Sequence, residues 1–545
     1  MKGLSHLKKN DIVYKKTGKV FNQHTYWTKQ PVSAIESFIE KHTLPGDSVL
    51  DPFCGSGMTG IAASKLNRNV YLSDNSPAAI HISEGYLQKI SFEKKILDDF
   101  LNSIKKDLNK IYYTNASSNI YKDKFLFDVI GEYFVDAKGK EFSEAKEIFL
   151  SIKEGTNYKQ KVDKNYEFCG YRPIYRFFVD HKTKKKQYVE FNSKFQSNDD
   201  KQILEIKKRI SNIEVPDTAL FGKEPKRNFK KGIKNVSDLY SRRNLYCLIY
   251  IRHKINKLKN HDLKQFLFFC FSSIVFNCSL MSRYRKYENT SIRMGTFYIP
   301  KVIKDNNVIA AFEKKVLSIY KAKRMSDIDR CNSTKIKIKE GDATNLKEIK
   351  SSSIDFIYTD PPYGDVINYS ELNVVFESWL NIHKKYNNEM IINEEFGQSA
   401  EDYFSMFKTF LIESSRVLKR NKYMVLIFHH PEVSLWAGVQ NCIFSSQFSI
   451  RKSTYPVRLF SESKTASQLS TNKRTQGFLA LELFNTKKNN NKKLKLLKDR
   501  DIENLIAKSK KEGYTSKSDI YDFFINNAIQ EFDLSSNKDL SEILG

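Results

Sequence analysis

Ser48-Val49-Leu50-Asp51-Pro52-Phe53-Cys54-Gly55-Ser56-Gly57 joins a short apolar run to a glycine-rich turn. The run is typical of a buried strand, and Met58–Leu66, which holds several small side chains, predicts a helix that packs closely on a sheet. A second predicted strand, Asn69–Leu72, ends at Ser73-Asp74. This order of strand, turn, helix and strand predicts a parallel α/β sheet, with a ligand crevice beyond the carboxyl ends of its strands.

A second string, Thr359-Asp360-Pro361-Pro362-Tyr363, follows the apolar run Ile354–Tyr358 and is expected at the same crevice. The Asp360 carboxylate can accept a hydrogen bond from an exocyclic amino group, and so can the backbone carbonyl of Pro361, which a fixed φ holds in place. Tyr363 offers a face on which an unstacked base can lie. The string therefore indicates chemistry on an aromatic amine.

The glycine-rich turn has the residues of a nucleoside-cofactor site. Gly55 and Gly57 allow the backbone to approach a ligand closely, and Asp51 can accept a hydrogen bond from an ammonium group. Asp74 lies about 20 residues beyond the glycines, where an acidic residue receives ribose hydroxyls; the alternative is a helix N-cap before Pro77. A P-loop is disfavoured because no Gly-Lys-Ser/Thr follows the turn, and an NAD site is disfavoured because the third glycine is missing.

Together the two motifs resemble those of S-adenosylmethionine (SAM)-dependent amino-methyltransferases, which methylate adenine N6 or cytosine N4 in DNA. The cofactor motif comes first, with a long insertion before Asp-Pro-Pro-Tyr, as in one circularly permuted arrangement of the family. The resemblance covers residues 20–90 and 335–485. It implies an α/β fold: a Rossmann-like SAM-dependent methyltransferase sheet with a large α+β insertion domain and a small helical C-terminal appendage.

The resemblance also implies the site residues. Trp27–Pro31 resembles the segment that closes over the methionine end of SAM, the alternative being an aromatic-capped surface helix. Asp342, after the alternating run Lys335–Lys339, resembles the residue that receives the adenine amino group. The expected cofactor residues are Trp27, Gln30, Pro31, Asp51, Pro52, Phe53, Gly55, Ser56, Gly57, Thr59, Asp74, Asn75, Asp342 and Ala343, and the expected catalytic residues are Asp360, Pro361, Pro362 and Tyr363.

Two histidines follow a third apolar run. Tyr423–Phe428 predicts a strand, so that His429 and His430 are expected at the same end of the sheet as the crevice. With Trp436 they look like one branch of the family, and the alternative is that one histidine caps the strand. No third ligand is suggested, so no metal site is predicted.

The domain organisation is predicted from the spacing of the motifs. Residues 1–90 and 335–485 form the two parts of the methyltransferase domain, and 486–545 form a basic linker and helical tail. Residues 91–334 are too long for a loop, must carry a core of their own, and are expected to be a DNA target-recognition domain. Within them, Ile174–Val179 and Gln187–Phe191 predict a hairpin, and Leu245–Ile255 and Phe266–Leu280 predict buried helices.

Charge points to a nucleic-acid partner. The net charge is +28, so DNA binding is expected, the alternative being a lysine-rich composition without function. The hairpin turn and a run of cations with an interleaved aromatic suit phosphates and an unstacked base. The residues expected to contact DNA are Lys184, Lys185, Lys186, Arg283, Tyr284, Arg285 and Lys286.

Seven cysteines without a C-x-x-C pair argue against a disulfide framework or a zinc ribbon. No apolar signal segment or membrane span is recognised, so a cytoplasmic protein is expected. No nuclease signature is present, which leaves a restriction or defence-system partner protein possible and the oligomeric state unknown.

The expected function is a site-specific DNA methyltransferase that acts on adenine N6, because Asp at the start of the catalytic motif is commonest in adenine-N6 enzymes of the family. Three alternatives stay open. They are a cytosine-N4 DNA methyltransferase, a tRNA guanine-N2 methyltransferase with a similar motif, and a catalytically silent DNA-binding subunit of a modification complex.

Overall fold

A computed structural model describes most of the chain. The described residues are 12–14, 22–112, 124–136, 138, 140–156, 158, 167–180, 182–210, 213–285, 292–324, 334–382, 389–451, 459–461, 479–487, 494–514 and 517–536.

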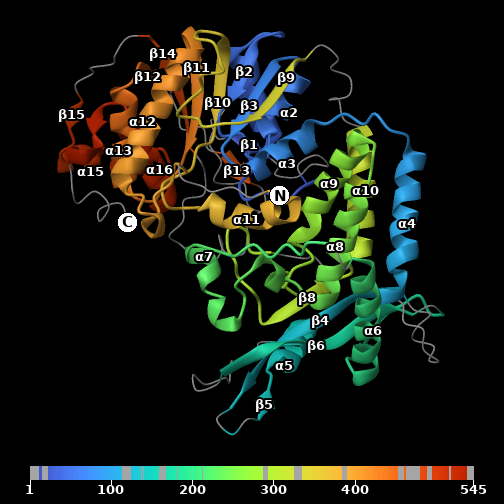
Figure 1. Cartoon of the computed structure of the whole chain (residues 1–545). Coiled ribbons are helices and arrows are strands. Elements are labelled where there is room, and N and C mark those ends of the chain that lie inside the picture. Colours follow the sequence, from blue (N-terminus) through green and yellow to red (C-terminus); the bar gives the residue numbers. More distant parts are fainter. Residues whose placement is uncertain are drawn as a thin grey trace.

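A seven-stranded sheet occupies the top of the molecule, with the strand order β12-β14-β11-β10-β2-β3-β9 (Figure 1). Its strands are β2 (Ser48–Asp51), β3 (Asn69–Asp74), β9 (Ile336–Glu340), β10 (Ile354–Thr359), β11 (Leu418–Phe428), β12 (Phe448–Ile450) and β14 (Leu479–Asn485). The five strands from β11 to β9 are parallel, and β14 is antiparallel to both of its neighbours. The strands expected at both motifs are therefore confirmed, and the mixed α/β sheet is consistent with a methyltransferase fold.

Strand β10 lies directly beside β2, although more than 300 residues separate the two motifs in the sequence. Phe356 pairs with Val49, and Ile357 pairs with Leu50. Because parallel strands end at the same edge of a sheet, this register brings the glycine-rich turn and the Asp-Pro-Pro-Tyr string together.

Alternating side chains divide the sheet between two cores. Val425 and Ile427 face one buried cluster, and Leu426 and Phe428 face the other. On the first face lie α1 (Val32–His42), α2 (Met58–Lys65), α3 (Pro77–Leu87) and α11 (Tyr369–Leu380), and on the second lie α12 (Ala400–Val417) and α13 (Val433–Phe444). The helix expected from Met58 is confirmed as α2.

The long inserted segment lies between α3 and β9. Its helices are α4 (Lys94–Tyr112), α5 (Ala145–Glu154), α6 (Ser193–Arg209), α7 (Lys223–Lys226), α8 (Arg242–Asn256), α9 (His261–Val275) and α10 (Val308–Arg324). Its strands are β4 (Lys124–Val135), β5 (Glu141–Phe142), β6 (Glu167–Val179), β7 (Lys186–Glu190) and β8 (Val302–Asn306), which form one sheet. The predicted hairpin is confirmed by the antiparallel pairing of β6 and β7, and the two buried helices are α8 and α9.

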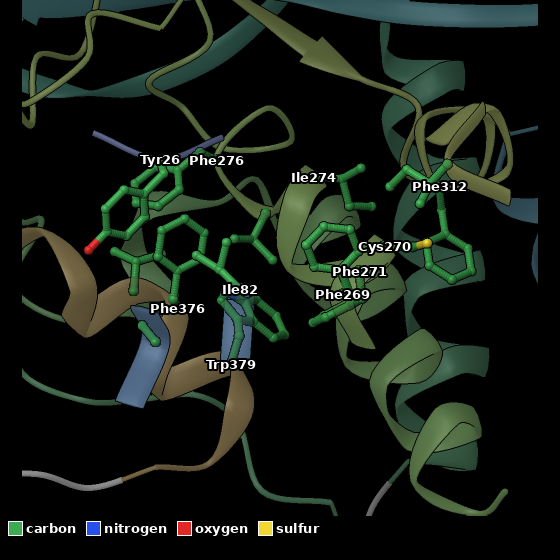
Figure 2. Close-up of a cluster of buried hydrophobic side chains, with 14 of the residues drawn as sticks. Tyr26, Ile82, Phe269, Cys270, Phe271, Ile274, Phe276, Phe312, Phe376 and Trp379 are labelled. Carbon is green, nitrogen blue, oxygen red and sulfur yellow. The ribbon is translucent and has the colours of Figure 1, made fainter. Parts of the chain in front are cut away.

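The sequence predicts a separate core for the inserted segment, but the inserted helices α4, α6, α8, α9 and α10 do not pack around one. One continuous buried cluster joins them to the first face of the large sheet, and Figure 2 shows Phe269 and Phe271 of α9 gathered with Ile82 of α3 and Trp379 of α11. Contact is very close at Gly85 in α3, where a Cβ atom would lie 2.1 Å from the Phe269 ring. Among the described residues, a separate cluster lies at the five-stranded sheet and includes Ala145 and Phe149 of α5. These five inserted helices therefore share one buried core with the first face of the large sheet.

The C-terminal residues form the expected helical appendage. They comprise β15 (Lys495–Leu496), α15 (Asp499–Lys511), α16 (Lys517–Ala528) and β16 (Phe532–Asp533). Phe524 and Ile525 join the same buried cluster as Trp436 of α13, and the Gln440 amide donates to the carbonyl of Ile529 at 2.8 Å. A further two-stranded parallel sheet pairs β1 (Ile12–Tyr14) with β13 (Leu459–Ser461). No helix in the described part of the chain is long and apolar enough to cross a bilayer.

Candidate active site

An open cavity with an empty volume of about 970 Å³ lies at the carboxyl ends of β2, β3, β9 and β10. This is the place where ligands bind in open α/β sheets. The predicted site residues that line it are Gln30, Asp51, Pro52, Phe53, Gly55, Ser56, Thr59, Asp74, Asn75, Asp342, Ala343, Asp360 and Pro362. Both sequence motifs therefore open into one cavity.

The glycine-rich turn depends on two residues with left-handed backbone. Gly55 has a φ of 49° and Gly57 a φ of 76°, a region that favours glycine. The Gly57 amide donates to the Cys54 carbonyl at 2.7 Å and closes the turn. A Cβ on Gly57 would lie 2.8 Å from the Ser83 hydroxyl of α3, and Gly57 is not among the residues that line the cavity. Gly57 thus packs α2 against α3, whereas the sequence predicts contact with the cofactor.

Gly57→Ala is expected to lower the free energy of unfolding by about 2–4 kcal/mol, from a left-handed Cβ and from the clash with Ser83. Gly232→Ala is a matched control, because Gly232 has the same φ of 76° but nothing within 4 Å of its Cβ position. Gly232→Ala should lower the free energy of unfolding by about 1–2 kcal/mol, from the left-handed backbone alone. Equal losses for both variants, measured by denaturant unfolding, would exclude the packing role.

Asp51 and Asp74 hold the loops at the cavity floor. Asp51 is buried and accepts hydrogen bonds from the Thr59 hydroxyl at 2.6 Å and the Phe53 amide at 3.1 Å. Asp74 accepts from the amides of Gly55 and Ser76, each at 2.9 Å. The alternative in which Asp74 caps the next helix is wrong, because Ser76 is the N-cap of α3. Asp74 instead ties the glycine turn to the end of β3.

Burial raises the pKa of the Asp51 carboxyl to about 7, although Thr59 and Phe53 donate hydrogen bonds to it. Between about pH 4 and pH 7 the folded protein thus holds one more proton than the unfolded chain. As the pH rises through this range, the free energy of unfolding therefore falls by up to about 1.4 kcal/mol per pH unit.

In Asp51→Asn this contribution is absent. The melting temperature of the variant minus that of the wild type should therefore rise as the pH increases from 4 to 7, and level off above pH 7. Other titrating groups cancel in the difference. A difference that stays constant across this range would show that Asp51 ionises normally in the folded protein.

Asp342 lies two residues beyond the end of β9 and lines the cavity. Its carboxylate accepts from the amide and the hydroxyl of Thr344, at 2.8 and 2.7 Å, and these bonds fix the turn that exposes Ala343 to the cavity. Strand β9 neighbours β3 at the edge of the sheet, and the assignment of Asp342 to an adenine amino group stays a prediction.

Asp360 is oriented from two sides. The Gln30 amide donates to its Oδ2 at 2.8 Å, and the Tyr363 hydroxyl donates to its Oδ1. The Tyr363 ring packs edge-on against Phe428, with ring centroids 5.2 Å apart, and does not line the cavity. Burial, followed by the adjacent Asp360 charge, raises the pKa of the Tyr363 phenol well above its usual range. Tyr363 is therefore a neutral donor that holds the carboxylate.

The string that carries Asp360 is fixed to the following loops. The Tyr403 hydroxyl donates to the Pro362 carbonyl at 2.8 Å, and the Ile392 amide donates to the Gly364 carbonyl at 3.2 Å. Pro361 is buried and, like Pro31 at the N-cap of α1, is not among the lining residues.

Trp27 differs from its expected place. Its side chain is buried, donates from Nε1 to the Asn373 side chain at 2.7 Å, and meets the edge of Phe276. The indole therefore packs in the core, and the cavity wall at this segment is built from Tyr26, Thr28, Lys29 and Gln30 instead. An indole that contacts the apolar α9–α11 interface gains more from burial than from a polar cavity.

Several residues that line the cavity were not predicted from the sequence. Lys29 lies within the Trp27–Pro31 segment; burial, followed by Lys315, lowers its pKa to about 7, and its ammonium donates to the His24 carbonyl at 2.7 Å. Glu389 accepts from the Ser370 amide at 3.0 Å, and burial raises its pKa to about 7. The other missed residues, which belong to no motif, include Tyr369, Met390 and Met406.

The two histidines lie at the expected edge but outside the cavity lining. His430 is buried, its Nδ1 accepts from the Glu432 amide at 3.0 Å, and its carbonyl accepts from the Trp436 indole at 3.0 Å. Burial lowers the pKa of His429 to about 4. The capping alternative therefore describes His430.

The residues expected to contact DNA fall into three groups. Lys184, Lys185 and Lys186 are exposed at the hairpin turn, and Arg283 and Arg285 are also exposed, while Lys286 lies outside the described residues.

The expectation for Tyr284 is wrong. This side chain is only 6% exposed and packs among Phe127, Phe149 and Phe177. It is a core residue of the five-stranded sheet and has no face free for a base.

Two comparisons with known proteins bear on this site. Residues 6–85 match the family model of the N6/N4 methyltransferases, described as DNA methylase. A stretch of 182 residues is 27% identical to the Type II methyltransferase M.MjaII of Methanocaldococcus jannaschii, and covers 33% of this chain and 31% of that relative. The chain thus spans about a third of the curated relative's length. The family match contains Asp51, the glycine turn and Asp74, and ends before Asp360.

Proposed function

Since both comparisons support the amino-methyltransferase family (N6/N4) that the two motifs resemble, we propose that the chain is a site-specific DNA methyltransferase that transfers a methyl group from SAM to adenine N6. The observation that carries the proposal is the register of β10 beside β2, which opens the glycine turn and Asp360 into one cavity. Adenine is proposed as the target because Asp360 begins the catalytic motif, as is commonest in adenine-N6 enzymes.

The donor set fits SAM. The cavity presents carboxylates at the ends of three successive strands, Asp51, Asp74 and Asp342, which suit an ammonium group, ribose hydroxyls and an adenine amino group. SAM, when bound, supplies a methyl group on a sulfonium. Holding the Gly55 amide does not bar Asp74 from a ribose hydroxyl, because a carboxylate oxygen can accept more than one hydrogen bond.

We assign to Asp360 the activation of the target amino group. The lone pair of an aromatic amine is delocalised into its ring, so the nitrogen is a poor nucleophile. A carboxylate oxygen that accepts one N–H, with the Pro361 carbonyl as second acceptor, favours the tetrahedral nitrogen and stabilises the positive charge that develops on it. Gln30 and Tyr363 hold the carboxylate in place, so little reorganisation is needed during transfer. The target base must leave the duplex to reach this depth.

A transfer assay with methyl-labelled SAM tests the proposal. Purified protein is offered mixed duplex DNA or tRNA, and label on each acceptor is counted. Label on DNA and none on tRNA supports the proposal. Label on tRNA alone would replace it with RNA methylation. Absence of label on either, with SAM still bound, would contradict it and favour the silent subunit.

A further inference from the structure

The segment Phe221–Asn235, together with Ile292–Tyr298, forms a surface that we name the basic rim. It lies against α11 on the side away from the large sheet, where Figure 1 places α7 beneath α11. Asn228 donates from its side chain to the Phe297 carbonyl at 2.6 Å, and this bond joins the two parts. The basic rim is therefore one surface built from two stretches of the inserted segment.

The basic rim adjoins the cavity through α11. Gly222 has a φ of 87°, and a Cβ there would lie 2.0 Å from the Glu371 carboxyl carbon. The Glu224 amide donates to Glu371 at 3.0 Å. Glu371 sits in the first turn of α11, two residues after Tyr369, which lines the cavity. This contact fixes the basic rim within one helical turn of the cavity wall.

A second connection runs through the loop that begins at Glu389. This loop gives Glu389 and Met390 to the cavity and continues to Phe396, whose ring centroid lies 5.9 Å from that of Phe221. Phe396 is 42% exposed. One loop thus lines the cavity at Glu389 and Met390 and contacts the basic rim at Phe396.

The charge of the basic rim is strongly positive. Its cations are Lys223, Lys226, Arg227, Lys230, Lys231, Lys234 and Arg293, and its one carboxylate is Glu224. Three of the cations have ionic partners: Lys226 with Glu395, Arg227 with Glu224, and Lys231 with Glu132.

The other four cations, Lys223, Lys230, Lys234 and Arg293, are exposed. No ionic partner is found for them within the described ranges. Exposed cations on a surface that adjoins a cavity suit phosphate contact.

The hairpin turn lies at the other end of the five-stranded sheet. Lys231 reaches Glu132 of β4, whereas the turn follows Val179, which pairs with Lys124 at the start of that strand. Eight residues of strand separate Lys124 from Glu132, about 26 Å. The hairpin lysines are therefore remote from the cavity, and any phosphate that they contact belongs to flanking duplex.

We propose that the basic rim is the surface that holds the phosphate backbone of a DNA duplex beside the cavity, so that a flipped base enters next to α11. The inference rests on the proposed function and identifies how its DNA substrate is held. Lys223, Lys230, Lys234 and Arg293 contact phosphates, and they fix the distance between duplex and cavity.

A charge-reversal experiment tests the proposal. The four cations are changed to glutamate (Lys223→Glu, Lys230→Glu, Lys234→Glu and Arg293→Glu), and affinity for a short fluorescent duplex is measured between about 50 and 200 mM salt. The matched control carries the same charge change on the exposed lysines of α4 and α10, with Lys95→Glu, Lys106→Glu, Lys314→Glu and Lys321→Glu. SAM affinity and melting temperature are measured for both, and the corresponding glutamine variants replace any reversal that fails to fold.

The rim variant should lose at least about tenfold in duplex affinity relative to the control variant, and its slope of log affinity against log salt should be smaller by about 3 to 4. Equal losses in both variants would overturn the proposal, as would a wild type that does not bind duplex at low salt. Methyl transfer by the wild type is scored separately. If duplex binding depends on the basic rim but no methyl transfer is seen, the proposed function is overturned and the basic rim remains a DNA-binding surface.

Discussion

Asp360→Ala is expected to lower the rate of methyl transfer to DNA by about 10³-fold, because the carboxylate that accepts a hydrogen bond from the amino group is lost. Binding of SAM should be nearly unchanged. The residues that we propose for the cofactor at the ends of β2, β3 and β9 are held by hydrogen bonds that do not involve Asp360. The measurement is single-turnover transfer of labelled methyl, with calorimetry for SAM binding.

Asp365→Ala is the matched control. This aspartate follows in the same loop, is 67% exposed, and does not line the cavity, so its loss should leave transfer close to that of the wild type. Tyr363→Phe removes the phenol that donates to Asp360 while keeping the ring on Phe428, and an intermediate loss is expected. Wild-type turnover by Asp360→Ala would remove this residue from the mechanism.

Arg243→Met is expected to lower the free energy of unfolding by about 3–5 kcal/mol, because it leaves the buried Asp305 without a cation and leaves Asp128 and Asp199 with Arg176 alone. The Arg243 guanidinium donates to Asp128 at 2.8 Å, Asp199 at 3.1 Å and Asp305 at 2.7 Å. All four residues are buried, and Arg176 is the other cation of the cluster. The network joins β4, α6, α8 and β8.

Arg242→Met provides the comparison at the neighbouring position. Arg242 is 67% exposed and pairs with Asp200 at 3.2 Å, so its removal should cost less than about 1 kcal/mol. Burial raises the pKa of Asp305 to about 6. The loss of unfolding free energy in Arg243→Met should therefore be smaller at pH 5 than at pH 8, because protonation at pH 5 neutralises the Asp305 carboxylate that has lost its cation. Similar losses in both variants, measured by urea unfolding, would show that the network contributes little.

The parts of the fold predicted correctly are those where local pattern and position agree. The apolar runs before Asp51 and Asp360 are strands β2 and β10, because a buried parallel strand needs a continuous apolar run. The shared cavity follows from the carboxyl-end rule. The sequence contains no comparable signal for Glu389 or Met390, which reach the cavity only through tertiary packing.

Two errors have physical causes. The inserted helices share the core of the large sheet because α3 offers Gly85 to Phe269, a fit between distant segments that no local pattern predicts. Tyr284 stands between Arg283 and Arg285 in an extended stretch beside β8. Successive side chains of extended backbone point to opposite sides. Because Arg283 and Arg285 face solvent, Tyr284 between them faces the core. That alternation was present in the sequence and indicates a sheet edge rather than a base-stacking run.

The most direct test of the central claim is to identify the methylated nucleoside. DNA incubated with the protein and labelled SAM is digested to nucleosides, and the product is identified by mass, with Asp360→Ala as the negative control. N6-methyladenine, formed by the wild type and absent with the variant, is the result we expect. N4-methylcytosine would keep the site and correct the base. Labelled DNA whose product carries the methyl group on a ring carbon, or an equal yield from Asp360→Ala, would contradict the account.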